Sequence, residues 1–208
     1  MILAAGTTAG LAVAEERSVG EQMSDASIKL RLNALWLEEM PDRYMDLGAT
    51  VVERRVLVTG TVPTPEDRVE AIRLAWAVDG VRSVVNRVEV ADSDGLGGFL
   101  RDSWISAQIE SRLTFDTAVF SVNYTVDTVR GTVYLMGIAQ DAEERRRVVG
   151  HARQVPYVRR IVDLTRLKGE PPPVPGTPPG DAGAIAAGAS GSGSADSATS
   201  AVERRPLE

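Results

Sequence analysis

The sequence predicts an α+β protein that consists of two consecutive small α-β-β-α-β sandwich domains followed by a disordered C-terminal tail. Two observations predict this architecture. An offset of 77 residues aligns residues 25–90 with residues 102–167 without a gap, and identical residues recur at about a dozen apolar and turn positions. Both copies then show the same order of helical and strand periodicities.

Each copy begins with an amphipathic helix, because apolar residues recur there at the spacing of one helical face. The first copy predicts a helix over residues 25–37, with its apolar face formed by Ile28, Leu32, Leu35 and Trp36. The second copy predicts a helix from about residue 102 to residue 114, with a matching face formed by Trp104, Ile105, Ile109 and Leu113.

Two strands follow each of these helices. They are expected over residues 45–52 and 56–62 in the first copy, and over residues 122–129 and 133–139 in the second. The second strand of each pair is rich in β-branched and large apolar residues, as in VLVTGTV and VYLMGIA. Gly60 and Gly137 lie inside these strands, where a glycine usually marks a bulge or a close backbone approach, so we assign them a structural role.

A second helix and a final strand complete each copy. Thr64 is a suitable N-cap for the helix in the first copy and Asp141 for the helix in the second. The first of these helices has an apolar stripe made of Val69, Ile72, Ala75 and Trp76. Both Trp36 and Trp76 are therefore expected in the core of the first domain. The final strand alternates along VVNRVEV in the first copy.

These elements divide the chain into two domains, over residues 24–92 and 101–168. Residues 93–100 contain Gly95, Gly97 and Gly98 and are expected to be a flexible linker. Residues 169–208 are rich in Pro, Gly, Ala and Ser without an aromatic residue, which predicts a disordered tail. Residues 1–23 precede the first domain as a separate N-terminal segment.

Composition and motifs exclude several classes of function. The 208 residues contain no cysteine and one histidine, His151, so disulfide frameworks, thiolate metal sites and cysteine nucleophiles are excluded and no metal site is expected. A net charge of −6 argues against nucleic-acid binding. No phosphate-binding loop, nucleophile elbow or zinc-protease motif occurs. We therefore expect a protein without catalytic activity or cofactor, and a structural or surface role for His151.

The repeat resembles the BON-domain family. The residues that carry the resemblance are the strand–glycine–helix step VLVTGTVPTPEDR with the ending VDGVRSVVNRVEV, and in the second copy VYLMGIAQDAEERRR with VPYVRRIVDLTRL. Two such domains in tandem, preceded by RSVGEQMSD and joined near DSWISAQIESRL, are similar to the dual-BON outer-membrane lipoproteins of the DolP type. The resemblance covers residues 17–167.

The resemblance implies a non-enzymatic protein of the bacterial cell envelope, located in the periplasm and peripheral to the outer membrane. In the DolP type, the first helix of the second domain binds anionic phospholipid, and the protein supports outer-membrane integrity. Carried onto this chain, the lipid-binding residues are Trp104, Ile109, Leu113, Phe115, Arg101 and Arg112. An anionic phospholipid membrane surface is then the expected partner, with envelope proteins as further partners.

The charge of the two domains agrees with lipid contact through the second one. Residues 24–94 carry 9 basic and 13 acidic side chains, whereas residues 101–168 carry 11 basic and 8 acidic ones. Basic groups attract an anionic bilayer, and a tryptophan suits its interface. Two alternatives stay open: Trp104 is instead a core or interdomain residue, or the protein is a periplasmic interaction module of the osmotic-stress type that does not bind lipid.

The N-terminal segment also has two interpretations. Residues 1–14 resemble the small-residue stretch that follows the lipidated cysteine in these lipoproteins, which makes Met1 an internal start with the cysteine encoded upstream. The other interpretation is a periplasmic protein without a lipid anchor. An in-frame lipobox in the DNA upstream of Met1 would support the first interpretation, and its absence would reject it.

Overall fold

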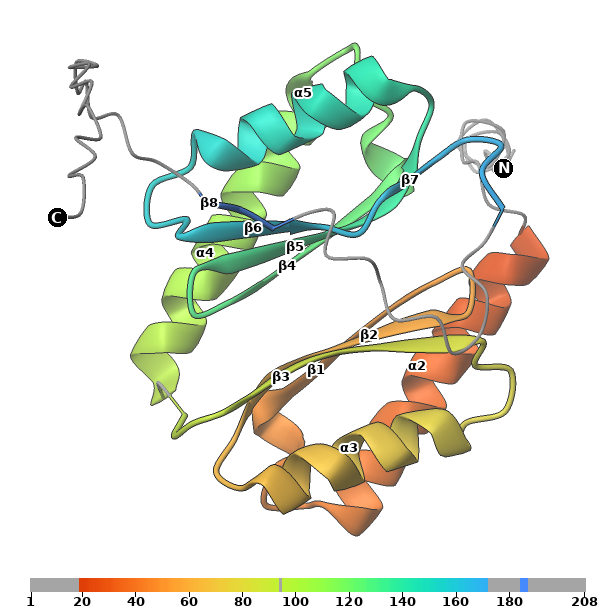
Figure 1. Cartoon of the computed structure of the whole chain (residues 1–208), viewed down its shortest axis with the longest axis vertical. Helices are drawn as coiled ribbons and strands as arrows, with labels where there is room; N and C mark the ends of the chain where they lie inside the picture. The colour runs from red at the N-terminus through yellow and green to blue at the C-terminus, as the bar shows by residue number, and fades with distance from the viewer. Residues whose placement is uncertain (1–18, 94, 172–183, 187–208) are drawn as a thin grey trace, which may run out of the picture.

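The computed structural model describes residues 19–93, 95–171 and 184–186, and it confirms the predicted α-β-β-α-β order in both copies (Figure 1). The first domain consists of α2 (Val19–Glu39), the short 3-10 helix η1 (Tyr44–Asp46), β1 (Leu47–Val52), β2 (Arg55–Val62), α3 (Pro65–Ala77) and β3 (Ser83–Val90). The second consists of α4 (Gly95–Phe115), η2 (Ser121–Asn123), β4 (Tyr124–Val129), β5 (Thr132–Ala139), α5 (Ala142–Arg153), β6 (Arg160–Asp163), β7 (Arg166–Leu167) and β8 (Ala184–Ala186).

The strands pair in the same way in both domains. β1 is antiparallel to β2, and β3 is parallel to β2 because α3 carries the chain back along the sheet between them. The register repeats with the sequence offset: Val56 pairs with Val84, and Val133 pairs with Ile161. β7 continues the parallel pairing with β5 beyond the end of β6. The sequence repeat is therefore also a structural repeat.

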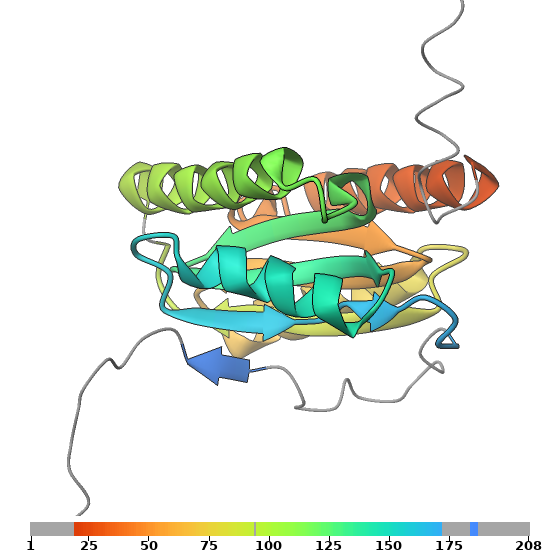
Figure 2. The ribbon, with the colours of Figure 1, turned by 90° about the horizontal axis from the view of Figure 1, so that it is seen from above.

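The two domains pack with their sheets face to face and their helices outside (Figure 1). Helices α2 and α3 contact the sheet of the first domain, and α4 and α5 contact the sheet of the second. Figure 2 shows that α2 and α4 lie along the same side of the molecule. The molecule thus has four layers, with both sheets in the middle.

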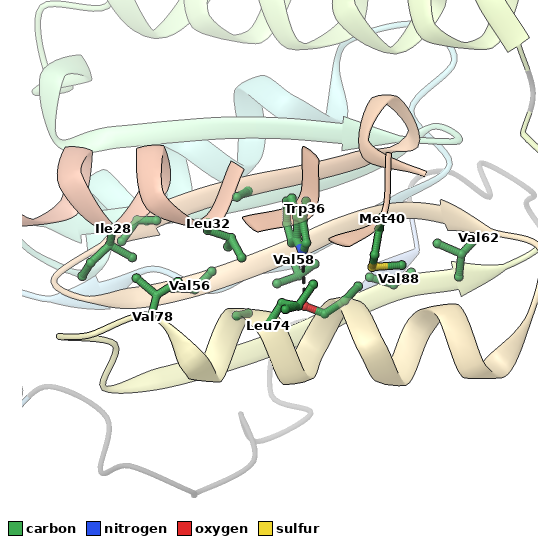
Figure 3. Packing of buried hydrophobic residues seen from close by; sticks show 14 residues of the cluster. Ile28, Leu32, Trp36, Met40, Val56, Val58, Val62, Leu74, Val78 and Val88 are labelled. Atoms are coloured by element: carbon green, nitrogen blue, oxygen red, sulfur yellow. Dashed lines mark hydrogen bonds between the residues drawn. The ribbon is translucent and has the colours of Figure 1, made fainter. Parts of the chain in front are cut away.

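The core of the first domain lies between α2, α3 and the sheet, as Figure 3 shows. Ile28, Leu32 and Trp36 project from one face of α2 and are fully buried, as the periodicity predicts. Trp36 Nε1 donates a hydrogen bond to the carbonyl oxygen of Ala71 on α3 at 3.2 Å. This bond satisfies the polar edge of a buried indole and holds the two helices close together.

The face of α3 differs from the prediction. Helix α3 begins as expected, since Thr64 Oγ1 accepts a hydrogen bond from Asp67 N at 3.1 Å. However, the predicted core residue Trp76 is 45% exposed, and Val69 is exposed as well. The buried residues of α3 are Ala71, Leu74 and Ala75. The two alanines on this buried face let α3 pack closely against α2, whereas Val69 and Trp76 turn outward.

An aspartate from the first helix of each domain, buried at Asp25 and half-buried at Asp102, fixes the following hairpin turn. The Asp25 carboxylate accepts hydrogen bonds from the backbone amides of Glu53 at 2.8 Å and Arg54 at 2.7 Å. Asp102 binds the amides of Arg130 and Gly131 in the same way, at 2.6 Å and 2.9 Å. The two central residues of each turn have positive φ, as the tight turn between twisted strands requires.

Gly60 and Gly137 occupy positions where the backbone of the preceding segment approaches closely. Their φ angles are 116° and 146°, in a region that disfavours other residues. A Cβ atom at Gly60 would lie 2.0 Å from the carbonyl oxygen of Asp46, and one at Gly137 would lie 2.1 Å from that of Asn123. Only glycine therefore leaves room for the end of η1 to pass close to β2 and for the end of η2 to pass close to β5.

A third apolar cluster joins the two sheets. It contains Val52, Leu57 and Val85 from the first domain together with Tyr134, Met136, Val162 and Leu164 from the second. Polar contacts surround it: Arg166 pairs with Glu53, Arg55 Nη1 donates to the carbonyl oxygen of Leu164 at 3.0 Å, and Thr59 Oγ1 donates to Asp127 Oδ2 at 2.5 Å. The domains are therefore held by a continuous interface.

The prediction of a flexible linker over residues 93–100 is wrong for most of that segment. Helix α4 begins at Gly95, so Gly95, Gly97 and Gly98 lie in its first turn. Glycine weakens a helix by about 1 kcal/mol per residue. Extending a helix that is already anchored costs less than starting one, and α4 is anchored by the buried residues Ile105, Ile109 and Leu113.

Both ends of the chain also differ in part from the expectation. Residues 19–23 of the predicted N-terminal segment belong to α2. In the predicted disordered tail, residues 184–186 form strand β8, which pairs antiparallel with β6. The expectations for residues 1–18, 172–183 and 187–208 lie outside the described residues.

Candidate functional site

The N-terminal half of α4 exposes a stripe of large apolar side chains. Leu96, Phe99, Leu100 and Trp104 recur at the spacing of adjacent helical turns, which places them along one side of the helix. Leu96 is 73% exposed and Trp104 is 42% exposed. Figure 1 shows this end of α4 reaching past the sheet of its own domain. We call these four residues the α4 stripe.

Tyr157 extends the α4 stripe from a distant part of the sequence. It lies in the loop between α5 and β6, is largely exposed, and has a φ of 69°. The rings of Trp104 and Tyr157 meet edge to face, with their centroids 6.2 Å apart and their planes at 67°. Such a contact is favourable for aromatic pairs and fixes the orientation of the indole. The two rings together form a partly exposed aromatic surface.

Arginines accompany this aromatic surface. Arg101 is exposed on α4, and Arg153, Arg159 and Arg160 are exposed in the segment around Tyr157. Arg112, by contrast, is half-buried and donates a hydrogen bond from Nη1 to Gln154 Oε1 at 3.1 Å. The exposed cationic groups thus lie on the two elements that carry Trp104 and Tyr157.

The structure divides the predicted lipid-binding residues into two groups. Ile109 and Leu113 are fully buried in the core of the second domain, so they are removed from the surface candidates. They face inward because they continue the helical face of Ile105 against β4 and α5. Phe115 is 83% exposed. It lies three turns, or about 16 Å, beyond Trp104 and projects from the same side of α4.

Leu96, Phe99, Leu100 and Tyr157 are additions that sequence reasoning missed. The spacing of positions 96, 99, 100 and 104 is helical, but the three glycines at its start favoured a linker. No local signal connects Tyr157 to Trp104, because 53 residues separate them and only the fold brings the α5–β6 loop to α4.

A groove of about 710 Å³ runs beside α4 on the side that faces η1 and β2 of the first domain. Leu96 and Phe99 contribute to its wall, and Asp46, Glu110 and Asp127 supply carboxylates. Burial raises the pKa of both Glu110 and Asp127. Because carboxylates gather here, the groove is a poor site for an anionic ligand, unlike the outer side of α4.

The other polar clusters in the described part of the chain do not form a metal site. His151 Nε2 lies 2.7 Å from Asp116 Oδ2, and this hydrogen bond lowers the pKa of the Asp116 carboxyl. No group of three or more His, Cys, Asp or Glu side chains among the described residues is placed to hold a metal ion. None of the described helices combines the length and apolar character needed to cross a membrane.

Comparison with known proteins identifies the domains. The BON domain model matches residues 24–92 and again residues 101–169, which together are more than half of the chain. The chain belongs to the BON-domain family. Each match spans one α-β-β-α-β unit, so the α4 stripe straddles the start of the second BON domain. Helix α4 carries Leu96, Phe99 and Leu100 before that match begins and Trp104 within it.

Several curated proteins are similar in sequence to this chain over most of its length. An uncharacterised protein from the gshII 5′ region of Anaplasma centrale is 39% identical over 70% of this chain and 96% of its own length. The outer membrane lipoprotein DolP of Haemophilus influenzae is 26% identical over 65% of this chain and 71% of its own. Osmotically-inducible protein Y of Escherichia coli is 26% identical over 72% of this chain and 76% of its own.

Proposed function

We propose that this BON-domain protein is a non-enzymatic protein of the bacterial cell envelope that docks on anionic phospholipid through helix α4 and supports outer-membrane integrity. The observation that carries the proposal is the α4 stripe, an exposed row of large apolar side chains on one side of a helix with arginines beside it. An interfacial helix binds a bilayer in this way, with apolar side chains among the headgroups and basic residues near the anionic surface.

The energetics favour reversible rather than permanent docking. Each basic residue near an anionic surface contributes about 1 kcal/mol, so Arg101 and the three exposed arginines in and beside the α5–β6 loop suffice for a weak attraction. Burial of an aromatic or leucine side chain adds roughly 1.5–3 kcal/mol. Trp104 and Tyr157 carry a polar edge on an apolar ring, which suits the boundary between headgroups and acyl chains.

The relatives support the place of action. DolP of Haemophilus influenzae is named an outer membrane lipoprotein, and this chain matches 71% of its length. We therefore propose a periplasmic location at the outer membrane. The name of the Escherichia coli relative, osmotically-inducible protein Y, points to the second candidate function, a periplasmic interaction module of the osmotic-stress type.

Sedimentation with vesicles tests the proposal, and two tryptophans provide a matched pair of variants. Trp104 and Trp76 are 42% and 45% exposed, one on α4 and the other on α3. We expect the full chain to sediment with phosphatidylglycerol vesicles, to stay in solution with phosphatidylcholine vesicles, and to lose binding as salt is added. Trp104→Ala should weaken binding at least about tenfold, and Trp76→Ala should not.

Circular dichroism of both variants serves as the control for folding. Equal loss of binding in Trp104→Ala and Trp76→Ala would show that the α4 stripe is not the contact. Absence of binding by the unmodified chain at low salt would reject lipid docking and favour the interaction module.

A further inference from the structure

The outer edge of the second sheet carries a strand contributed by the C-terminal tail. β8 pairs antiparallel with β6, with Ile161 opposite Ile185, Arg160 opposite Ala186 and Val162 opposite Ala184. The strand order is β4-β5-β6-β8, so β8 lies at the edge opposite to the strand that α4 contacts. Figure 2 shows the same separation between β8 and α4.

The directions of the β6 amides show why this edge can accept a strand. Arg160 N donates to the carbonyl oxygen of Gly131 at 3.4 Å, and Leu164 N, just after β6, donates to that of Leu135 at 2.8 Å, so the amides of even-numbered residues along β6 point toward β5. Because backbone amides alternate along a strand, the amide and carbonyl of Ile161 point outward. The pair of Ile161 and Ile185 is therefore the one that exchanges hydrogen bonds between the two strands.

A side-chain cap closes this open edge at Thr165, just beyond the end of β6. The carboxylate of Asp163 accepts hydrogen bonds from Thr165 N at 3.0 Å and Thr165 Oγ1 at 2.6 Å. By the same alternation the amides of Asp163 and Thr165 also point outward, and the Thr165 amide, just beyond β6, is already satisfied by this side chain. β8 covers the part of β6 that precedes the cap, residues 160–162, and its length of three residues matches that part.

The first domain shows the same capped edge without an added strand. Asn86 is the repeat equivalent of Asp163, and its Oδ1 accepts a hydrogen bond from Val88 N at 3.0 Å. The three residues before it, Ser83–Val85, correspond to the part of β6 that β8 covers. Among the described residues, no strand pairs with this outer edge of β3. The domain therefore folds with its edge open, and β8 is an addition to it rather than a part of the repeat.

The composition of the tail segment suits strand addition. Ile185 is the only large aliphatic residue between positions 175 and 201, and it is flanked by alanines and glycines in the stretch GAIAAG. Isoleucine has a high strand propensity, and its small uncharged neighbours bring no bulky or charged side chain to the edge. Residues 172–183, which connect it to the domain, include five prolines, and proline cannot supply the amides of a competing strand.

We propose that the outer edge of β6 at residues 160–162 is a strand-acceptor site for extended, uncharged peptides, and that segment 184–186 is its tethered resident. Recognition uses backbone hydrogen bonds to Ile161, and the partner is a protein segment with one branched apolar residue between small ones. The tether gives the resident an effective concentration of the order of mM, so a partner must displace it. This site is separate from the α4 stripe and does not depend on lipid docking.

Amide exchange in the full chain tests whether the tail is the resident. Ile185→Pro removes the amide that faces Ile161, whereas Ala184→Pro removes an amide that points away from β6. We expect Ile185→Pro to lower the exchange protection of the Ile161 amide about tenfold, the factor that corresponds to one hydrogen bond. Ala184→Pro should leave that protection nearly unchanged. Equal protection of Ile161 in the unmodified chain and in Ile185→Pro would overturn the assignment of the tail as resident.

Titration with a peptide of residues 181–188 tests whether the edge accepts a strand from another molecule. Amide NMR signals of β6 should shift in Ile185→Pro at mM peptide and should stay in place in the unmodified chain until much higher concentrations. The same peptide with proline at the position of Ile185 is the control. If the β6 signals of Ile185→Pro do not shift with the unmodified peptide, or if both peptides shift them equally, the edge is not an acceptor site.

Discussion

Single residues at crowded backbone positions decide whether each BON domain can fold. Gly137 leaves no room for a side chain, because a Cβ atom would lie 2.1 Å from the carbonyl oxygen of Asn123. Gly150 on α5 is the opposite case: no atom lies within 4 Å of the position that its Cβ would occupy. The same substitution therefore has opposite expected effects at two positions in the second domain.

We predict that Gly137→Ala destabilises the protein by about 3 kcal/mol or more, since it adds both a steric clash and an unfavourable φ. Gly150→Ala should instead stabilise it by about 0.5–1 kcal/mol, because alanine is the better helix former. Urea unfolding followed by circular dichroism measures both changes. A neutral Gly137→Ala variant would show that η2 can move away from β5 at little cost.

The aspartates that bind the hairpin turns act at the same scale. We predict that Asp102→Asn destabilises the protein by about 2–3 kcal/mol, because the amide offers one oxygen where two backbone N–H groups need acceptors, and hydrogen bonds to charged groups contribute about 1.5–3 kcal/mol each. Asp92→Asn, at an exposed position, is the control. Equal urea midpoints for the two variants would contradict the assigned role of Asp102 in the hairpin turn.

At the scale of the element, the orientation of α3 separates two tryptophans with the same predicted role. Trp36 is fully buried and bonded to Ala71, whereas Trp76 is 45% exposed. We predict that Trp36→Ala costs about 3–5 kcal/mol of unfolding free energy, the usual range for a buried tryptophan, and that Trp76→Ala costs less than about 1 kcal/mol. Thermal or urea unfolding distinguishes them, and similar losses would contradict the orientation of α3.

The elements also show what the sequence could predict and what it could not. Order and type of the elements follow from local periodicity and capping residues such as Thr64 and Asp141, and these predictions agree with the structure. The buried face of α3 could not be predicted from the local sequence, because Ala71 is buried by its contact with Trp36, which lies 35 residues away. The glycine-rich segment that begins at Gly95 likewise favoured a linker, because its composition does not reveal that buried residues further along the chain anchor α4.

The candidate site was predictable only in part for the same reason. Trp104 and Phe115 are exposed where a surface role needs them, whereas Ile109 and Leu113 belong to the core. Sequence alone places all four on one helix but does not tell which side the sheet covers. Tyr157 joins the site only through the packing of a distant loop.

At the scale of the whole molecule, the interface between the sheets contains a carboxyl group of the second domain that is hydrogen-bonded to a residue of the first. Asp127 on β4 accepts a hydrogen bond from Thr59 on β2 at 2.5 Å. Burial raises the pKa of Asp127, and this effect outweighs the opposing influence of the bonds from Thr59 and the backbone and of the charge of Lys29, while Asp102 raises it further. The charged form is therefore less favourable in the folded protein than in the unfolded chain.

The direction of this shift fixes a pH dependence of stability. A carboxyl whose pKa is raised on folding contributes stability that is fully present below its unfolded value of about 3.9 and is lost as pH rises through the folded value. We predict that Asp127→Asn, which keeps an acceptor for Thr59 but carries no charge, is more stable than the unmodified protein at pH 7. The gain should shrink as pH is lowered, because Asp127 then binds a proton more readily in the folded state than in the unfolded chain.

Urea unfolding of both proteins at several pH values between 4 and 7 measures this difference, and subtraction removes the contribution of all other carboxyl groups. Asp42→Asn, at an exposed position, provides the comparison and should show no such trend. A difference between Asp127→Asn and the unmodified protein that stays constant with pH would contradict a raised pKa at Asp127. A variant that loses stability at pH 7 would show instead that the charge itself holds Thr59, and with it the two sheets, together.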